Sequence, residues 1–328
     1  MERFGFGSGF QFGWVFDTKI TMKRFIALLL LFGSFGAQAQ TQNDRLILRK
    51  GVILDSLPVA DTAAKDLKIY LPRDFETTRT WPLIFICVEN EKALQAMRSM
   101  SAAAEKNGFI LAATDAVDDT LTLTDKVLRI NTGLKKLGEF LPLNQRRIYT
   151  SGYDMGGQLA TLVPSLIRPV RGVLSIGSGL GTPELIGDAG SFEFVGVMGR
   201  ADYQYSDMRA AEEFLDRKKI RNHVLYHPGG HQWPDARYMD LGMQFLNLMA
   251  MKDPGTEKDT EFIRTSYEDF KDYILNLEEG GDLLLALDQV EEGLSLYDAL
   301  IETDWLKDRR KELRKNRTYR AQKRDWEQ

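Results

Sequence analysis

The sequence predicts an α/β fold, in which a doubly wound, mostly parallel sheet is followed by an all-helical appendage. From Leu46 to about Asp253, short apolar runs alternate with longer segments whose apolar residues recur at helical spacing. Such alternation with short loops is typical of a parallel sheet that helices cover on both faces. Residues 256–328 carry only helical patterns, so we expect a separate helical region there.

The predicted strands are short and strongly apolar. Trp81–Asn90 is an almost continuous apolar run, as expected for a strand buried on both faces of a parallel sheet. Leu67–Pro72 alternates instead and ends at a proline. The expected strands are Leu67–Pro72, Trp81–Asn90, Phe109–Asp115, Arg146–Gly152, Val170–Gly179, Phe192–Asp202 and Asn222–His231.

Segments with helical spacing separate and follow these strands. Gly108 is expected to end the first helix, because glycine is a frequent helix stop. The expected helices are residues 91–108, Thr124–Leu141, 156–167, Tyr205–Ile220 and 234–251.

The helical region begins after a boundary near residues 252–259. Residues 260–280 and 282–301 each place aromatic and aliphatic residues on one helical face, which predicts two antiparallel helices with a third behind them. A tetratricopeptide-like repeat is one interpretation, although no clean second copy is present. The tail Lys307–Arg324 holds ten basic and two acidic residues, which indicates a solvated helix face or a site for an anionic partner. A protein partner could bind through these helices.

Composition excludes several kinds of site. The chain has 328 residues, of which 43% are hydrophobic, and a net charge of −4, so nothing global indicates a nucleic-acid partner. The single cysteine, Cys87, rules out a disulfide within the chain and a cysteine-based metal cluster. Only three histidines are present, which makes a zinc site unexpected. We expect no metal and no cofactor. The expected ligand or substrate is a small molecule.

The N-terminal residues 1–39 read as an upstream extension plus a signal peptide. Within Met22–Gln40, Lys23 and Arg24 precede a short apolar run, and residues 37–39 form an Ala-Gln-Ala cleavage site. The apolar run is too short to span a bilayer. We therefore expect cleavage near Ala39, export to the periplasm or the extracellular space, and a mature chain without a transmembrane anchor.

One short stretch, TSGYDMGGQLA, predicts a sharp turn between a strand and a helix. Gly152 and Gly156 flank Asp154, and side chains at the glycine positions would clash where the strand and helix backbones approach. Asp154 is then held in a strained conformation above the carboxyl edge of the sheet. The backbone N–H of Met155 points to the same place, which supplies half of an oxyanion hole.

Two later residues complete a candidate catalytic set. Asp202 follows the end of one predicted strand and His231 follows the next, so both are expected at the same sheet edge as Asp154. The order of nucleophile, acid and histidine is that of α/β-hydrolases. Alternatively, Asp202 caps a helix and His231 is a packed turn residue. His223 and His227 are weaker candidates for a catalytic role.

Residues 44–253 resemble the secreted α/β-hydrolase family found in Bacteroidetes, which is related to dienelactone hydrolases, carboxylesterases and polyhydroxybutyrate depolymerase-like esterases. The matching segments are IYLPRDF, WPLIFICV, AAAEKNGFILAATD, RRIYTSGYDMGG, VGVMGRADYQY and PGGHQWP. The resemblance implies an α/β-hydrolase fold. It also implies a nucleophile–histidine–acid site at positions 154, 231 and 202.

The chain departs from this family in two places. Asp154 replaces the serine or cysteine nucleophile. Related esterases carry His-Gly after the WPLIFICV strand, whereas this chain has Val88-Glu89-Asn90. The other oxyanion donors would be the backbone groups of Val88 and Glu89, and the Glu89 carboxylate adds negative charge where an oxyanion would form.

Three hypotheses about function follow from Asp154. In the first, the Asp154–His231–Asp202 site is silent or binds a ligand, because two carboxylates around one imidazole favour the imidazolium, which cannot act as a general base. In the second, Asp154 attacks an epoxide, a haloacid or an ester-like molecule, since GYDMGG resembles the Gly-His-Asp-Trp-Gly turn of epoxide hydrolases and haloalkane dehalogenases. In the third, the chain is a scaffold that acts through its C-terminal helices.

Overall fold

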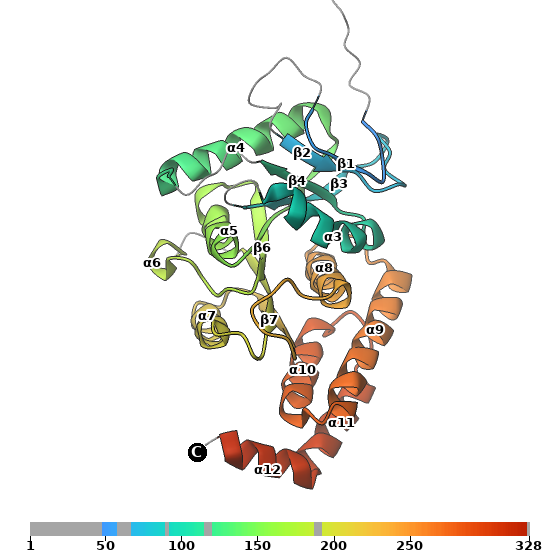
Figure 1. Cartoon of the computed structure of the whole chain (residues 1–328). Helices are drawn as coiled ribbons and strands as arrows, with labels where there is room; N and C mark the ends of the chain where they lie inside the picture. The colour runs from blue at the N-terminus through green and yellow to red at the C-terminus, as the bar shows by residue number, and fades with distance from the viewer. Residues whose placement is uncertain (1–47, 58–66, 89–91, 115–119, 187–191, 327–328) are drawn as a thin grey trace, which may run out of the picture. The chain divides into compact units, whose positions relative to one another are not determined.

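The structure is a computed structural model that describes residues 48–57, 67–88, 92–114, 120–186 and 192–326 (Figure 1). The predicted signal peptide and the candidate oxyanion residue Glu89 lie outside the described residues. By its internal contacts, Leu46–Gln328 is one compact unit. No helix within the described ranges is long and apolar enough to cross a membrane.

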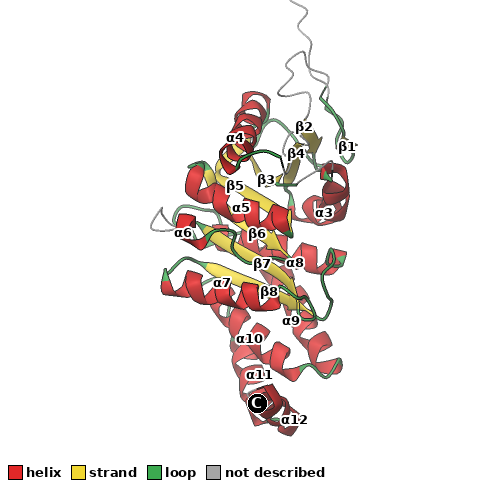
Figure 2. Cartoon of the chain, turned by 60° about the vertical axis from the view of Figure 1, so that its left-hand side comes forward, coloured by secondary structure: helices red, strands yellow, loops and turns green. Residues whose placement is uncertain are grey.

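The predicted mostly parallel sheet is confirmed. It has eight strands in the order β1-β2-β4-β3-β5-β6-β7-β8, which lie side by side in Figure 2. The first two strands are antiparallel additions at one edge, and the strands from β4 to β8 run parallel. The strands are β1 Ile53–Leu54, β2 Leu67–Tyr70, β3 Trp81–Ile86, β4 Ile110–Thr114, β5 Leu143–Tyr153, β6 Val170–Ile176, β7 Glu193–Gly199 and β8 Asn222–His227.

The predicted boundaries are wrong mainly at the carboxyl ends of strands. The strand predicted to reach Asn90 ends at Ile86, and the one predicted to reach His231 ends at His227. After His227 the chain forms a loop at the sheet edge, and apolar composition does not reveal that departure. The buried character of the central strands is confirmed, because every residue of β3, β4 and β7 is buried.

Helices cover both faces of the sheet. In Figure 1, α4, α5 and α7 lie on one side of the strands and α3 and α8 lie on the other. Gly133 of α4 packs closely on the sheet, since a Cβ there would lie 3.1 Å from the Phe85 ring and 3.2 Å from Leu67. The helices are α3 Ala93–Asn107, α4 Leu123–Phe140, α5 Met155–Leu166, α6 Pro183–Ile186, α7 Tyr205–Arg217 and α8 Ala236–Met251.

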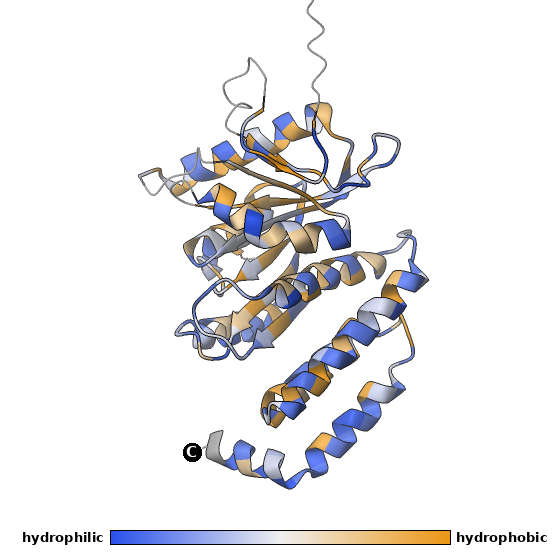
Figure 3. Ribbon diagram, turned by 45° about the vertical axis from the view of Figure 1, so that its right-hand side comes forward, coloured by the Kyte–Doolittle hydropathy of each residue, from blue (hydrophilic) through white to orange (hydrophobic). Residues whose placement is uncertain are grey.

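The predicted helical C-terminal region is present. It comprises α9 Thr260–Glu279, α10 Leu283–Leu296, α11 Asp304–Lys315 and α12 Arg317–Trp326. Helices α9 and α10 pack together around the buried rings of Phe270, Tyr273 and Tyr297, whereas the last two helices are mainly hydrophilic (Figure 3). The division into two domains near residues 252–259 and the repeat interpretation stay predictions.

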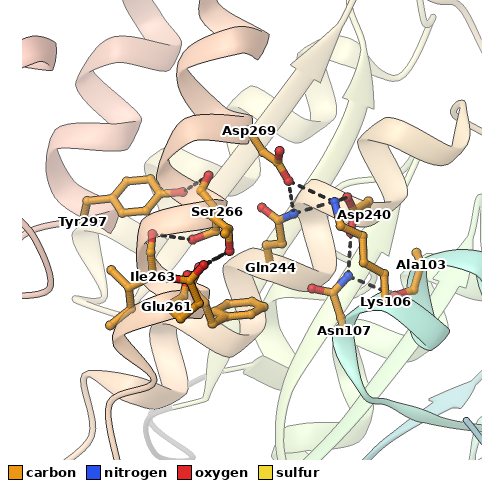
Figure 4. Close-up of polar contacts among 12 residues, drawn as sticks. Ala103, Lys106, Asn107, Asp240, Gln244, Glu261, Ile263, Ser266, Asp269 and Tyr297 are labelled. Atoms are coloured by element: carbon orange, nitrogen blue, oxygen red, sulfur yellow. Dashed lines mark hydrogen bonds and ion pairs between the residues drawn. The ribbon is translucent and has the colours of Figure 1, made fainter. Parts of the chain in front are cut away.

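Polar contacts attach these helices to the α/β region. Lys106 of α3 lies between Asp240 of α8 and Asp269 of α9, at 2.7 and 2.9 Å (Figure 4). Gln244 of α8 donates to the same Asp269 carboxylate at 3.1 Å. On the other side, Gln289 of α10 donates to the backbone oxygen of Val224 at 3.0 Å. The edge strand β8 is therefore covered by α10, which protects its unpaired edge.

One largely buried carboxyl near this contact makes stability depend on pH. Glu212 of α7 accepts a hydrogen bond from the Tyr226 hydroxyl at 2.5 Å and pairs with Arg209 at 3.0 Å. Burial raises the pKa of Glu212 to about 7, and the carboxylates of Glu292 and Asp288 on α10 act in the same direction. The folded chain therefore retains a proton that the unfolded chain loses first, so stability falls as pH rises from about 5 to about 8.

Glu212→Gln is expected to reduce this pH dependence by up to about 2 kcal/mol, because the amide keeps an acceptor for the hydroxyl and cannot ionise. Urea unfolding of wild type and variant at pH 5 and pH 8 measures the difference. Glu213→Gln, at an exposed position of the same helix, is the matched control. An equal loss of stability in wild type and Glu212→Gln between these pH values would contradict the role assigned to Glu212.

Candidate active site

The turn predicted around Asp154 has the expected geometry. β5 ends at Tyr153 and α5 begins at Met155, and Asp154 between them has φ 54° and ψ −124°. A non-glycine residue in this region is strained by about 1–3 kcal/mol. Gly156 allows the close approach, since a Cβ there would lie 2.3 Å from the backbone oxygen of Cys87. The fold therefore holds Asp154 in a strained turn against the neighbouring strand.

Asp202 and His231 meet, as predicted from their places after β7 and β8. The Nδ1 atom of His231 lies 3.0 Å from Oδ2 and 3.1 Å from Oδ1 of Asp202. The Asp202 side chain is only 1% exposed, so the carboxylate in this contact is shielded from water. Asp202 Oδ1 also accepts the backbone N–H of Gln204 at 2.8 Å. Asp202 thus orders the loop before α7 and orients the imidazole as well.

The contact between His231 and Asp154 is loose. His231 Nε2 lies 3.8 Å from Asp154 Oδ1, which is too long for a hydrogen bond. The nearer polar atom is the hydroxyl of Tyr203, at 3.3 Å from the same nitrogen, and the two rings are 4.4 Å apart. The three predicted residues therefore lie together, but a tyrosine hydroxyl competes for the nitrogen that would face a nucleophile.

Gln204 is a site residue that the sequence reasoning missed. Its Nε2 donates to Asp154 Oδ1 at 2.7 Å and to the Tyr203 hydroxyl at 3.2 Å. The residue is buried, and its Oε1 has no hydrogen-bond partner among the described residues. Three consecutive residues, Asp202, Tyr203 and Gln204, therefore contact His231 or Asp154. Adjacency to Asp202 was the available signal, but sequence does not show where loop side chains point.

A small cavity of about 110 Å³ lies beside Asp154. The candidate oxyanion residues Met155 and Val88 both line it. A larger cavity, about 580 Å³, lies between α3, α8 and α9, and none of the predicted site residues lines it. Within the described ranges, no group of three or more His, Cys, Asp and Glu residues could hold a metal ion. The remaining lining residues beside Asp154 are Lys92, Gln95, Ala96, Tyr153, Gly156 and Trp233.

The other two histidines have structural contacts. His223 bonds to Glu292 of α10 and so links β8 to the helical region. His227 accepts the backbone N–H of Gly229 at 3.1 Å and stacks on Tyr238. Burial lowers the pKa of His227, which favours the neutral ring.

The strand order, the turn at Asp154 and the meeting of Asp154, Asp202 and His231 define an α/β-hydrolase fold. Among solved structures, the chain is similar to an S-formylglutathione hydrolase from Staphylococcus aureus, with 13% identity and a TM-score of 0.45 over 62% of this chain and 99% of that one. It is also similar to a truncated carbohydrate esterase from gut microbiota, with 15% identity and a TM-score of 0.48 over 60% and 96%.

A third similar structure is Est1E from Butyrivibrio proteoclasticus, with 12% identity and a TM-score of 0.44 over 57% of this chain and 93% of that one. These neighbours are esterase-type hydrolases, and at such identities the likeness concerns the fold alone. No protein-family model and no curated protein sequence matches this chain.

Proposed function

We propose that this chain is a hydrolase homologue without ordinary serine esterase activity, whose altered site binds a small ligand and does not turn it over. The observation that carries the proposal is the Asp154 carboxylate at the nucleophile position, held by the Gln204 amide at 2.7 Å. A carboxylate that attacked an ester would have to form an anhydride, which is a poor route for acyl transfer. The usual hydroxyl, activated by histidine, is absent from position 154.

The surroundings of His231 support the same proposal. In a serine hydrolase, the histidine removes a proton from the nucleophile. An ionised Asp154 has no proton to give, and His231 Nε2 is nearer to the Tyr203 hydroxyl than to Asp154. The imidazole held by Asp202 then contributes hydrogen-bonding groups and shape to a binding site.

A second candidate is a hydrolase that uses Asp154 as its nucleophile on an epoxide, a haloacid or an ester-like molecule. The intact pair of His231 and Asp202, at 3.0 Å, favours it, because an oriented imidazole could activate the water that hydrolyses an ester intermediate. The leaving group also needs stabilisation. The described residues between β6 and β7, where related enzymes insert a cap, form only the four-residue helix α6.

The scaffold hypothesis has less support. In the part of the chain that the structure describes, the exposed large hydrophobic side chains lie outside α9–α12, so no apolar groove is seen on these helices. Binding of a protein partner to helices α9–α12 is a proposal that rests on the sequence. The proposal has two further parts, which rest on the sequence alone. The chain is exported after cleavage near Ala39, and it belongs to a secreted Bacteroidetes-type family.

The mature chain from Gln40 tests the proposal when it is assayed on short-chain activated esters, an epoxide and a haloacetate. We expect the same background rates for wild type, Asp154→Asn and His231→Asn, because none of these residues acts on a substrate. Turnover of the epoxide or the haloacetate by wild type that both substitutions abolish would overturn the proposal and support the second candidate.

A further inference from the structure

Among the described residues that line it, the cavity beside Asp154 carries opposite charges, and from this we infer that its ligand is a small zwitterion of the amino-acid class. The inference rests on the proposed ligand-binding function. Lys92 and Asp154 both line the cavity but form no ion pair with each other. Two unlike charges that share a small cavity without neutralising each other are complementary to a ligand with both an ammonium and a carboxylate group.

The acidic side of the cavity is Asp154. Its Oδ1 accepts one hydrogen bond from Gln204, and its Oδ2 accepts none from the described residues. A carboxylate has about four lone-pair positions, so most of its acceptor capacity is unused. The Asp154 side chain is 35% exposed, which leaves it reachable from the cavity. A ligand ammonium, which has only donors, fits this side.

The basic side is the beginning of α3. Lys92 precedes the first residue of α3, and Gln95 lies three residues later on the same helical face. Lys92 has no ion-pair partner in the described part of the chain, and the two side chains together offer ammonium and amide donors. The first turn of α5, at Met155 and Gly156, also lines the cavity, and a helix N-terminus favours an anion. Among the described residues, this side therefore offers positive charge and hydrogen-bond donors, which a ligand carboxylate would accept.

Size and the remaining wall limit the ligand further. The cavity has a volume of about 110 Å³, against about 580 Å³ for the cavity between α3, α8 and α9, which favours a small ligand. Trp233 stacks on Tyr153 with ring centroids 5.1 Å apart, and this pair forms an apolar wall beside the charges. A small amino acid with a short apolar side chain meets all three requirements. A simple amine or a simple carboxylate would use only one of the two charges.

Calorimetric titration of the mature chain with L-alanine, ethylamine and propionate at pH 7 tests the inference. Ethylamine lacks only the carboxylate and propionate lacks only the ammonium. We expect alanine to bind about tenfold more tightly than either, because each charged contact adds to the affinity. Lys92→Met should lower alanine affinity to the level of ethylamine and leave ethylamine binding unchanged. Asp154→Asn should lower alanine affinity to the level of propionate. Lys135→Met, at an exposed position of α4, is the control.

The inference is overturned if ethylamine or propionate binds as tightly as alanine, if Lys92→Met leaves alanine affinity unchanged, or if alanine does not bind. Circular dichroism of the variants shows that they are folded. If alanine fails to bind and wild type also shows no site-dependent turnover, this inference fails and the proposed function stands. If wild type turns over the epoxide or the haloacetate, the proposed function fails, whatever the titration with alanine shows.

Discussion

Asp154→Ser is expected to hydrolyse short-chain activated esters at least about 10²-fold faster than wild type, which is the lower range for general-base catalysis. The serine hydroxyl would stand in the strained turn where Asp154 now lies, and it has a proton for His231 to remove. His231 is already oriented by Asp202 at 3.0 Å. Initial rates of ester hydrolysis for the purified proteins measure the gain.

Two further variants identify the source of that gain. Asp154→Ala removes the carboxylate without supplying a nucleophile and should stay at background. Asp154→Ser combined with His231→Asn should lose the new activity, because the general base is gone. If a folded Asp154→Ser protein hydrolyses esters only at the background rate, the aspartate at position 154 is not the reason why ester hydrolysis is absent.

Gly156→Ala is expected to destabilise the fold by about 3 kcal/mol. The added Cβ would lie 2.3 Å from the backbone oxygen of Cys87 and 3.6 Å from the Cα of Val88, and neither backbone atom can rotate away as a side chain would. The turn must then open, which separates α5 from β3 beside the cavity. Urea unfolding at neutral pH measures the loss, and circular dichroism shows whether the variant still folds.

Gly138→Ala is the matched control for this substitution. Gly138 lies within α4, where an added Cβ would meet nothing within 4 Å. Alanine favours the helix over glycine, so this variant should gain about 0.5–1 kcal/mol. If Gly156→Ala were as stable as wild type, α5 would not be packed against the Cys87–Val88 backbone as described.

Much of the fold could be predicted because the spacing of apolar residues along the sequence indicates which residues are buried. The continuous apolar run from Trp81 identifies a central strand that is buried on both faces. The two-residue strand β1, Ile53–Leu54, was not predicted, since so short a segment shows no periodicity. Its pairing with β2 depends on tertiary contact at the sheet edge and not on its own composition.

The sequence predicted which loops bring the candidate site residues together. It did not predict which side chains from these loops contact one another. Asp154, Asp202 and His231 come together because each follows a strand of the same parallel sheet, a relation that chain order reveals. The hydrogen bond from Gln204 to Asp154 depends on a loop side chain turning inward, which no sequence pattern specifies. The approach of Lys92 to the same cavity depends on how α3 packs.

Oxygen-18 labelling tests most directly whether Asp154 acts as a nucleophile. Wild-type protein in excess is incubated with the epoxide or the haloacetate in water labelled with oxygen-18, and the mass of the peptide that contains Asp154 is measured by mass spectrometry. We predict no label in Asp154, because no ester forms on its carboxylate. Label in Asp154 together with product would show that water has hydrolysed an Asp154 ester, and it would contradict the proposal of a non-catalytic binding site.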